Sequence, residues 1–424
     1  MLLYYRIKQG VACSEAHMNQ FESISEDEAR NGDGPLFFLV SLEPATNMVS
    51  QLVHRSSHLI DKSWEPLIWF TDSDSTMTDA AIPPWVIQRI SEGKVFMVNV
   101  NHPRWEERLG MNFTRGSRIH IAGLGDVGGT LLMGLRALGG PCVREIGIFD
   151  VDNKKMDRWV YEANQIYSPN VDSFPIVKPI GQNDLFHCDI FIFSVAKATP
   201  PLDQTNKDVR MAQYHENGEI IRRYANMARG REFKGLFAVV SDPVDQLALL
   251  AYQESNLNEN GEFDYAGLFP EQVKGYGLGV MNARARYYAG RASGNKSNVD
   301  ELRVFGPHGK GLVVANSIEN YSHSESIWLT EKTLNANLDV RATGFKPYVA
   351  PAFSSACYPI LDTIQGNWHY STVYLDGVYF GCRNRSHPFG SQWETAGLPL
   401  PLKKSLHETY QYLIGFSKMP YRIT

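Results

Sequence analysis

A chain of 424 residues exceeds what one hydrophobic core usually holds, so we expect two or three domains. With 43% hydrophobic and 21% charged residues, the composition is that of a globular protein and excludes a largely disordered one. The formal net charge of -5 argues against nucleic acid or an anionic membrane surface as a partner.

The five cysteines are odd in number and widely spaced, and no two form a CxxC pair. This usage is typical of reduced thiols in the cytoplasm. The N-terminal residues contain no long apolar segment, and the apolar runs elsewhere are far shorter than a membrane span. We therefore expect a cytoplasmic protein without a membrane anchor.

Residues 1–115 predict a small accessory α+β module. Strand-like runs lie at Leu3–Ile7 and at residues 36–42, 67–71 and 95–100, with polar loops between them. The stretch 101–116 is polar and has neither helical nor strand periodicity, so we interpret it as a linker.

From Arg118 onward, strands alternate with helices. RIHIAG, EIGIFDVD, CDIFIFSVA and LFAVVSDPVD are the predicted strands, and residues 127–140, 154–166 and 208–229 are the predicted helices. This alternation indicates parallel strands with right-handed crossovers, hence a doubly wound α/β sheet of the Rossmann type over residues 116–250.

The remainder, residues 251–424, predicts a substrate-binding and catalytic α+β domain. It mixes helical segments with the strand-like pieces ELRVFG and HYSTVYLDGVYFG, and it ends in a predicted helix at 404–416.

The sequence GLGDVG places Gly123, Gly125 and Gly128 after a strand and at the start of a helix. In this G-x-G-x-x-G context the glycines allow a tight turn, an approach of pyrophosphate to the backbone, and close helix packing. Asp150, at the end of the next strand, can bind ribose hydroxyls and favours NAD over NADP. The alternative is that the glycines serve only a strand-to-helix turn. The predicted cofactor-binding residues are Gly123, Gly125, Asp126, Val127, Gly128, Asp150, Ser194 and Ala196.

In the order of its motifs the chain resembles the lactate/malate dehydrogenase family. The matching segments are IAGLGDVGG, IGIFDVD, FAVVSDPVD, GYGLGVMNARARYYAGR, VFGPHGKG and LPLPLKKSLHETYQYL. They cover about 70% of the chain and leave the N-terminal module outside. The resemblance implies a Rossmann half, an α+β substrate half, hydride transfer at the nicotinamide of NAD, a small substrate with a carboxylate, and a homo-oligomer, either dimer or tetramer.

The resemblance also implies site residues, with departures. His308 in GPHGKG matches the family's proton-transferring histidine, and Arg284 in NARAR matches the arginine that grips the substrate carboxylate. The aspartate that orients the histidine falls on Met281. The loop arginine is absent from TPPLDQTNKDV, where Lys207 is the candidate substitute, and the family's asparagine is Asp242.

Three functions are compatible with these departures. Without an acidic neighbour for His308, a site made more acidic by Asp242 suits reduction of an imine or oxidation of an amine, whose cation Asp242 would steady. The second is conventional 2-hydroxy-acid chemistry, with Lys207 and another residue restoring the missing groups. The third is an NAD-binding scaffold or sensor without turnover.

Several of these residues also have structural interpretations. Asp242 could cap a turn before its proline, Arg286 competes with Arg284, and Lys207 could be an ordinary solvated lysine. His54 and His58 have the spacing of two metal ligands on a helix, but no third ligand is evident, so we predict no metal.

Overall fold

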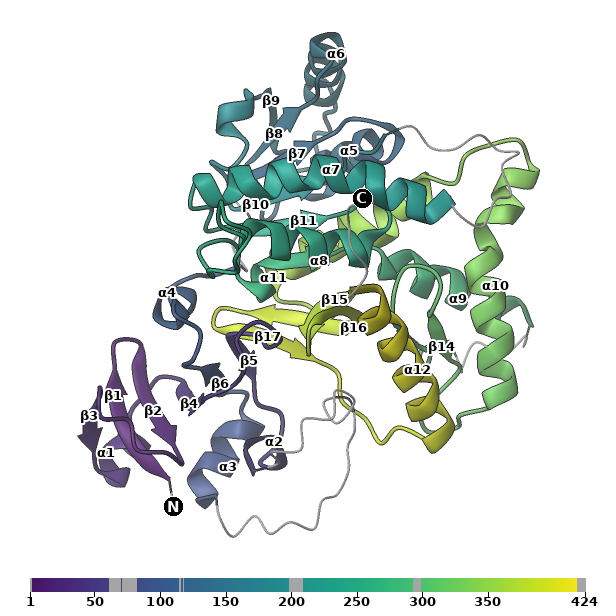
Figure 1. Cartoon of the computed structure of the whole chain (residues 1–424). Coiled ribbons are helices and arrows are strands. Elements are labelled where there is room, and N and C mark those ends of the chain that lie inside the picture. Colours follow the sequence, from purple (N-terminus) through teal and green to yellow (C-terminus); the bar gives the residue numbers. More distant parts are fainter. Residues whose placement is uncertain are drawn as a thin grey trace.

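The computed structural model describes residues 2–60, 70, 82–113, 116, 118–197, 209–292 and 299–417. The strand predicted at 67–71 lies outside the described residues except for Phe70, and so does Lys207. The predicted fold class is confirmed, with a Rossmann sheet and a second, α+β half (Figure 1).

The Rossmann half is built on a six-stranded sheet in the order β12-β11-β10-β7-β8-β9, and all of its neighbours pair in parallel. This is the strand order typical of dinucleotide-binding sheets, in which the first strand lies at the centre. The strands are β7 (Arg118–Ala122), β8 (Glu145–Phe149), β9 (Ile176–Pro179), β10 (Ile190–Phe193), β11 (Leu236–Val239) and β12 (Val273–Gly275).

The helices of this half connect successive strands. They are α5 (Asp126–Leu138), α6 (Asn153–Asn164), α7 (Val209–Gly230) and α8 (Val244–Ser255), with a short 3-10 turn η3 (Gln182–Asp184) before β10. Asp152 caps α6, because its side chain accepts hydrogen bonds from the amides of Lys154 and Lys155. The helices predicted at 127–140, 154–166 and 208–229 correspond to α5, α6 and α7.

The second sheet joins the two ends of the chain. Its nine strands run in the order β15-β16-β17-β5-β6-β4-β2-β1-β3. Figure 1 shows the N-terminal strands at lower left, with β15–β17 between them and the Rossmann half. The strands are β1 (Leu3–Ile7), β2 (Gly10–Ser14), β3 (Glu22–Ile24), β4 (Leu36–Val40), β5 (Ser50–Leu52), β6 (Val95–Asn99), β15 (His369–Leu375), β16 (Val378–His387) and β17 (Gly390–Trp393).

The N-terminal residues therefore extend the sheet of the C-terminal half. The join is the parallel pairing of β17 with β5, where Ser391 is the partner of Gln51. The boundary placed between residues 250 and 251 falls inside α8. The division at 115 and 250 stays a prediction.

Helices complete both halves. The N-terminal ones are α1 (Glu26–Asn31), α2 (Ser57–Ile60), α3 (Pro84–Ser91) and α4 (Trp105–Leu109). The C-terminal half contains η4 (Pro270–Gln272), α9 (Leu278–Ala292), β13 (Arg303–Phe305), β14 (Val313–Ala315), α10 (His323–Ala342), the π-helical turn η6 (Pro351–Cys357), α11 (Tyr358–Gln365) and α12 (Leu400–Ser417).

The interpretation of 101–116 as a linker is wrong, because this stretch contains α4 and a buried ion pair. Arg108 Nε lies 3.0 Å from Glu271 Oε1, and the side chains are 1% and 0% exposed. Glu271 also accepts hydrogen bonds from the amides of Val49 (3.3 Å) and Ser50 (2.8 Å). One carboxylate thus holds β5, α4 and η4 together, and a polar sequence could not show this.

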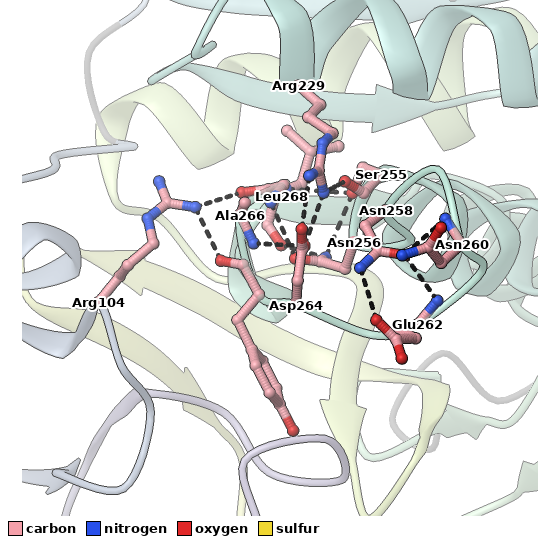
Figure 2. Close-up of polar contacts among 12 residues, drawn as sticks. Arg104, Arg229, Ser255, Asn256, Asn258, Asn260, Glu262, Asp264, Ala266 and Leu268 are labelled. Atoms are coloured by element: carbon pink, nitrogen blue, oxygen red, sulfur yellow. Dashed lines mark hydrogen bonds and ion pairs between the residues drawn. The ribbon is translucent and has the colours of Figure 1, made fainter.

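A polar loop fastens α4 to the Rossmann helices (Figure 2). Arg104 Nη1 donates to the backbone oxygens of Tyr265 (3.0 Å) and Gly267 (2.8 Å). Asp264 of the same loop accepts two hydrogen bonds from Arg229 of α7, at 2.7 and 2.6 Å. Such a two-pronged contact fixes both position and orientation.

Among the residues that the structure covers, no helix combines the length and the apolarity needed to cross a membrane.

Replacing Arg108 with Met should strongly destabilise the fold, because Glu271 would keep a buried charge without its cation. We expect the free energy of unfolding to fall by about 3–5 kcal/mol in urea titrations. Arg158→Ala, which removes an exposed pair with Glu162, should change it by less than about 1 kcal/mol. Equal, small effects of the two changes would contradict this role for Glu271.

Candidate active site

Three parallel strands end side by side at the candidate site. In the register of the sheet, Phe193 of β10 pairs with Ala122 of β7 on one side and with Val239 of β11 on the other. The residues that follow these three strands therefore meet at one edge. Ligands of open α/β sheets bind beyond the carboxyl ends of the strands.

The glycine loop follows β7 and has the predicted form. Gly123 has a φ of +93°, which favours glycine. A Cβ on Gly128 would lie 2.0 Å from the Gly123 carbonyl oxygen, so this glycine allows α5 to approach the loop. A Cβ on Gly125 would have no atom within 4 Å, and this face of the loop is open for a ligand.

Asp150 lies at the end of β8, as predicted, and is 9% exposed. Its carboxylate accepts hydrogen bonds from the amides of Leu124 (2.8 Å) and Asp152 (3.1 Å), and Lys155 Nζ lies 3.2 Å away. Burial raises the pKa of Asp150, but these donors outweigh it and hold the pKa below the usual value. The group is therefore a carboxylate that can accept hydrogen bonds from ribose hydroxyls.

A cavity of about 520 Å³ opens at this edge of the sheet, between the Rossmann half and helices α9 and α10. It brings together predicted residues from both halves. Its lining includes Asp126, Val127, Ser194, Ala196, Asp242, Met281, Arg284 and His308.

His308 has an acidic partner in this cavity. Its Nδ1 lies 2.7 Å from Asp242 Oδ1. The expectation that His308 lacks an acidic neighbour is therefore wrong: the carboxylate comes from the end of β11, while Met281 stands where the family has its aspartate. The N-cap residue of α8 is Pro243, which directly follows Asp242. A role for Asp242 in the turn before this proline stays a prediction.

The backbone around His308 is fixed by neighbouring elements. The His308 amide donates to Asp245 Oδ2 at 2.9 Å, and Asp245 is 5% exposed. A Cβ on Gly277, in the turn between β12 and α9, would lie 2.7 Å from His308 Cβ. Only a glycine at 277 therefore leaves room for the histidine in this position.

Asn217 of α7 connects the ends of β10 and β11. Its amide donates to the Asp242 carbonyl oxygen at 2.7 Å and its Oδ1 accepts from the Lys197 amide at 3.0 Å. Sequence reasoning missed this residue, because one polar residue in an amphipathic helix gives no signal. Its effect is to hold the backbone of Asp242 against the adjacent strand end.

Arg284 lies in the cavity, and its rival does not. Burial lowers the pKa of the Arg284 guanidinium, and the nearby charge of Asp242 opposes that shift. Arg286 instead forms an ion pair with Asp300 at 2.7 Å and donates to the Val299 carbonyl oxygen at 2.9 Å. Arg284 is thus the arginine placed to meet a ligand.

The cavity is richer in cations than the sequence suggested. Lys197, Arg341 and Lys346 line it together with Arg284, whereas its acidic lining residues are Asp126 and Asp242.

Both acids are already paired: Asp126 with Lys346 at 3.2 Å, and Asp242 with His308. Within the described ranges, Lys197, Arg284 and Arg341 form no ion pair. The prediction of a site made more acidic counted only the positions that match the family. It did not include the cations of α10 and of the segment after it, which the structure brings to the cavity.

His54 and His58 do not belong to this site. Their rings lie 5.9 Å apart, and the ring of His54 lies 5.7 Å from that of Trp393 in β17. The expected placement on one helix is wrong, because His54 precedes α2. No group of three or more His, Cys, Asp or Glu residues suited to a metal ion occurs in the part of the chain that the structure describes.

Comparisons with known proteins agree with this architecture. No family model matches the chain. L-lactate dehydrogenase 1 of Staphylococcus aureus is 24% identical over 201 residues, which are 47% of this chain and 57% of that enzyme. The chain thus spans just over half the length of the curated relatives it matches.

Solved structures extend the comparison over both halves. A minor L-lactate dehydrogenase from Enterococcus mundtii has a TM-score of 0.59 and 18% identity, covering 73% of this chain and 100% of that one. The chain has the lactate/malate dehydrogenase fold. The malate dehydrogenase of Archaeoglobus fulgidus in complex with NADH gives a TM-score of 0.56 at 16% identity, over 70% of this chain and 97% of that one. These relatives support the family resemblance that the motifs predict.

Two glycine variants should show which glycine is needed for the folding of the loop and which one faces the open site. Gly128→Ala forces a Cβ against the Gly123 carbonyl oxygen and should lower the free energy of unfolding by more than about 1 kcal/mol. Gly125→Ala meets open space and should unfold like the wild type in urea titrations. Similar losses in both variants would contradict the assignment of Gly125 to an open, ligand-facing position.

Asp245 should make stability pH-dependent. Burial raises the pKa of its carboxyl to about 6 from an ordinary 3.8. Between these two pH values the carboxyl of Asp245 is ionised in the unfolded chain but still protonated in the folded one. The free energy of unfolding of the wild type therefore falls as the pH rises. Asp245→Asn does not titrate, and its stability relative to the wild type should therefore rise by about 3 kcal/mol between pH 4 and 7.

Asp264 is a control for which the pH dependence of stability should have the opposite sign. The hydrogen bonds that it accepts from Arg229 lower the pKa of its carboxyl to about 2. Asp264→Asn should lose stability relative to the wild type as the pH rises from 2 to 4. Urea titrations across this range check both variants, and a pH-independent difference for Asp245→Asn would show that its carboxyl titrates normally.

Proposed function

We propose that the protein is an NAD-dependent oxidoreductase that transfers hydride between the nicotinamide and a small substrate with a carboxylate. The observation that carries this proposal is the pair formed by His308 Nδ1 and Asp242 Oδ1, 2.7 Å apart, in a cavity that also reaches the glycine loop. A histidine with a carboxylate on one ring nitrogen can move a proton at the other.

The residues around the loop fit a dinucleotide. The open face at Gly125 and the amides at the start of α5 would take the pyrophosphate, and Asp150 would accept the ribose hydroxyls. A carboxylate at this position disfavours a 2′-phosphate, so we favour NAD over NADP. When bound, the nicotinamide supplies or accepts the hydride.

His308 would manage the proton. With Nδ1 directed at Asp242, its Nε2 is the nitrogen for the substrate oxygen. In reduction, His308 would donate its Nε2 proton to the carbonyl oxygen of the substrate, and in oxidation Nε2 would take the proton from the hydroxyl. Asp242 would fix the orientation of the ring through its contact with Nδ1.

Arg284 would bind the substrate carboxylate through its two-pronged guanidinium. The surplus of cations in the cavity, together with the engagement of Asp242 by His308, favours a 2-oxo or 2-hydroxy acid. An imine cation would need Asp242 for itself, which is why we rank reduction of an imine second. We place an NAD-binding scaffold without turnover third.

The test is NADH oxidation by the purified protein with matched panels of 2-oxo acids and cyclic or substituted imino acids. We expect turnover with 2-oxo acids, and we expect His308→Ala to lower kcat by roughly 10²–10⁴-fold while NADH still binds. NADH fluorescence titration provides the control for binding.

The other results are equally clear. Turnover with imino acids alone would show that the substrate is an imine and not a 2-oxo acid. NADH binding without turnover on either panel would make the protein a scaffold or sensor. Undiminished activity of His308→Ala would remove the histidine from the mechanism.

We further propose that the protein works in the cytoplasm, where its free cysteines would stay reduced. The resemblance to lactate/malate dehydrogenases supports a homo-oligomer, either dimer or tetramer. Sedimentation of the purified chain measures the assembly, and a monomer at micromolar concentration would contradict it.

A further inference from the structure

Lys346 reaches the phosphate loop from the other half of the molecule. It lies between the end of α10 and η6, and its Nζ is 3.2 Å from Asp126 Oδ2 at the first residue of α5. Both residues line the candidate cavity. The two side chains are 59% and 51% exposed, and an ion pair so exposed adds little to stability. A gain in stability from this ion pair is therefore too small to explain why Lys346 lies beside Asp126.

The surrounding packing brings the segment that carries Lys346 close to α5. The residue after Lys346 is Pro347, which favours an extended backbone at 346. η6 follows and packs closely on α5, where a Cβ on Gly134 would lie 2.8 Å from Cys357 Sγ. Because η6 is packed against α5, the segment before η6 that carries Lys346 lies close to that helix, and the ammonium contacts its first residue.

The negative charge of Asp126 at this end of α5 would oppose the binding of a pyrophosphate unless a cation neutralises it. An acid in the first turn stabilises a helix, but here its carboxylate lies beside the amides that would receive a pyrophosphate with two negative charges. Repulsion between the carboxylate and that ligand must be offset. Lys346 is the cation that contacts Asp126 among the described residues.

We propose that Lys346 is a cofactor-binding residue that donates directly to the pyrophosphate of the dinucleotide while it also neutralises Asp126. This inference rests on the proposed function, since it assumes a dinucleotide at the glycine loop. It adds a contact from the catalytic half, so cofactor binding would depend on how the two halves are held together. The chemistry recognised is a pyrophosphate diester, whatever base or ring it carries.

The test compares dissociation constants for NADH and for ADP-ribose, which keeps the pyrophosphate and lacks the nicotinamide. The variants are Lys346→Met, Lys346→Arg, Asp126→Asn and the double variant Asp126→Asn/Lys346→Met. Lys332→Met, on an exposed position of α10, is the matched control. Titration calorimetry gives both constants without relying on turnover.

We expect Lys346→Met to weaken both ligands about tenfold, whether Asp126 is kept or the chain also carries Asp126→Asn, and we expect Lys346→Arg to restore most of the affinity. Unchanged affinity in Lys346→Met would overturn the inference and leave the proposed function standing. A loss confined to chains that keep Asp126 would overturn the direct contact, since neutralisation alone would then suffice. If the wild type binds neither ligand, the proposed cofactor and this inference both fail.

Discussion

The parallel pairing of β7, β10 and β11 is the constraint on which the site depends. Because Ala122, Phe193 and Val239 are neighbours in register, the glycine loop and the loops after β10 and β11 begin at the same edge of the sheet. Asp242 is three residues beyond the end of β11, and His308 reaches it from the loop between β13 and β14. A slip in this register would separate the dinucleotide loop from the candidate acid and base.

The C-terminal half contributes side chains to the same cavity, and we assign it no separate site. α9 carries Arg284, and the segment after α10 returns Lys346 to the start of α5. The N-terminal residues enter through the nine-stranded sheet and through Glu271, whose carboxylate joins β5, α4 and η4. The described N-terminal residues are therefore part of the structural support of the C-terminal half, and we assign them no chemistry of their own.

Much of this could be predicted from the sequence, for a physical reason. A buried strand, a glycine-rich turn and a helix form a local unit, so GLGDVG and Asp150 identify the dinucleotide half directly. His308, Arg284 and Asp242 were predicted singly. The bond between His308 and Asp242 was not, since it joins residues 66 positions apart and replaces an aspartate that the resemblance locates elsewhere.

The remaining features depend on long-range contacts that leave no local pattern. The pairing of β17 with β5 rests on Ser391 and Gln51, and Arg108 lies in a stretch whose polarity is typical of a linker. Likewise, Arg341 and Lys346 are ordinary basic residues until the packing of α10 and η6 brings them to the cavity. The charge of the cavity therefore depends on residues that only the three-dimensional packing brings together.

The central proposal is that Asp242 supplies the carboxylate that His308 would need to act as the acid and base. The most direct measurement is kcat/KM for NADH-dependent reduction by Asp242→Asn, with the dissociation constant of NADH determined in the same preparation. The account predicts a loss of about 100-fold or more in kcat/KM with NADH affinity little changed. Full activity in Asp242→Asn would contradict it, because His308 would then work without its acidic partner.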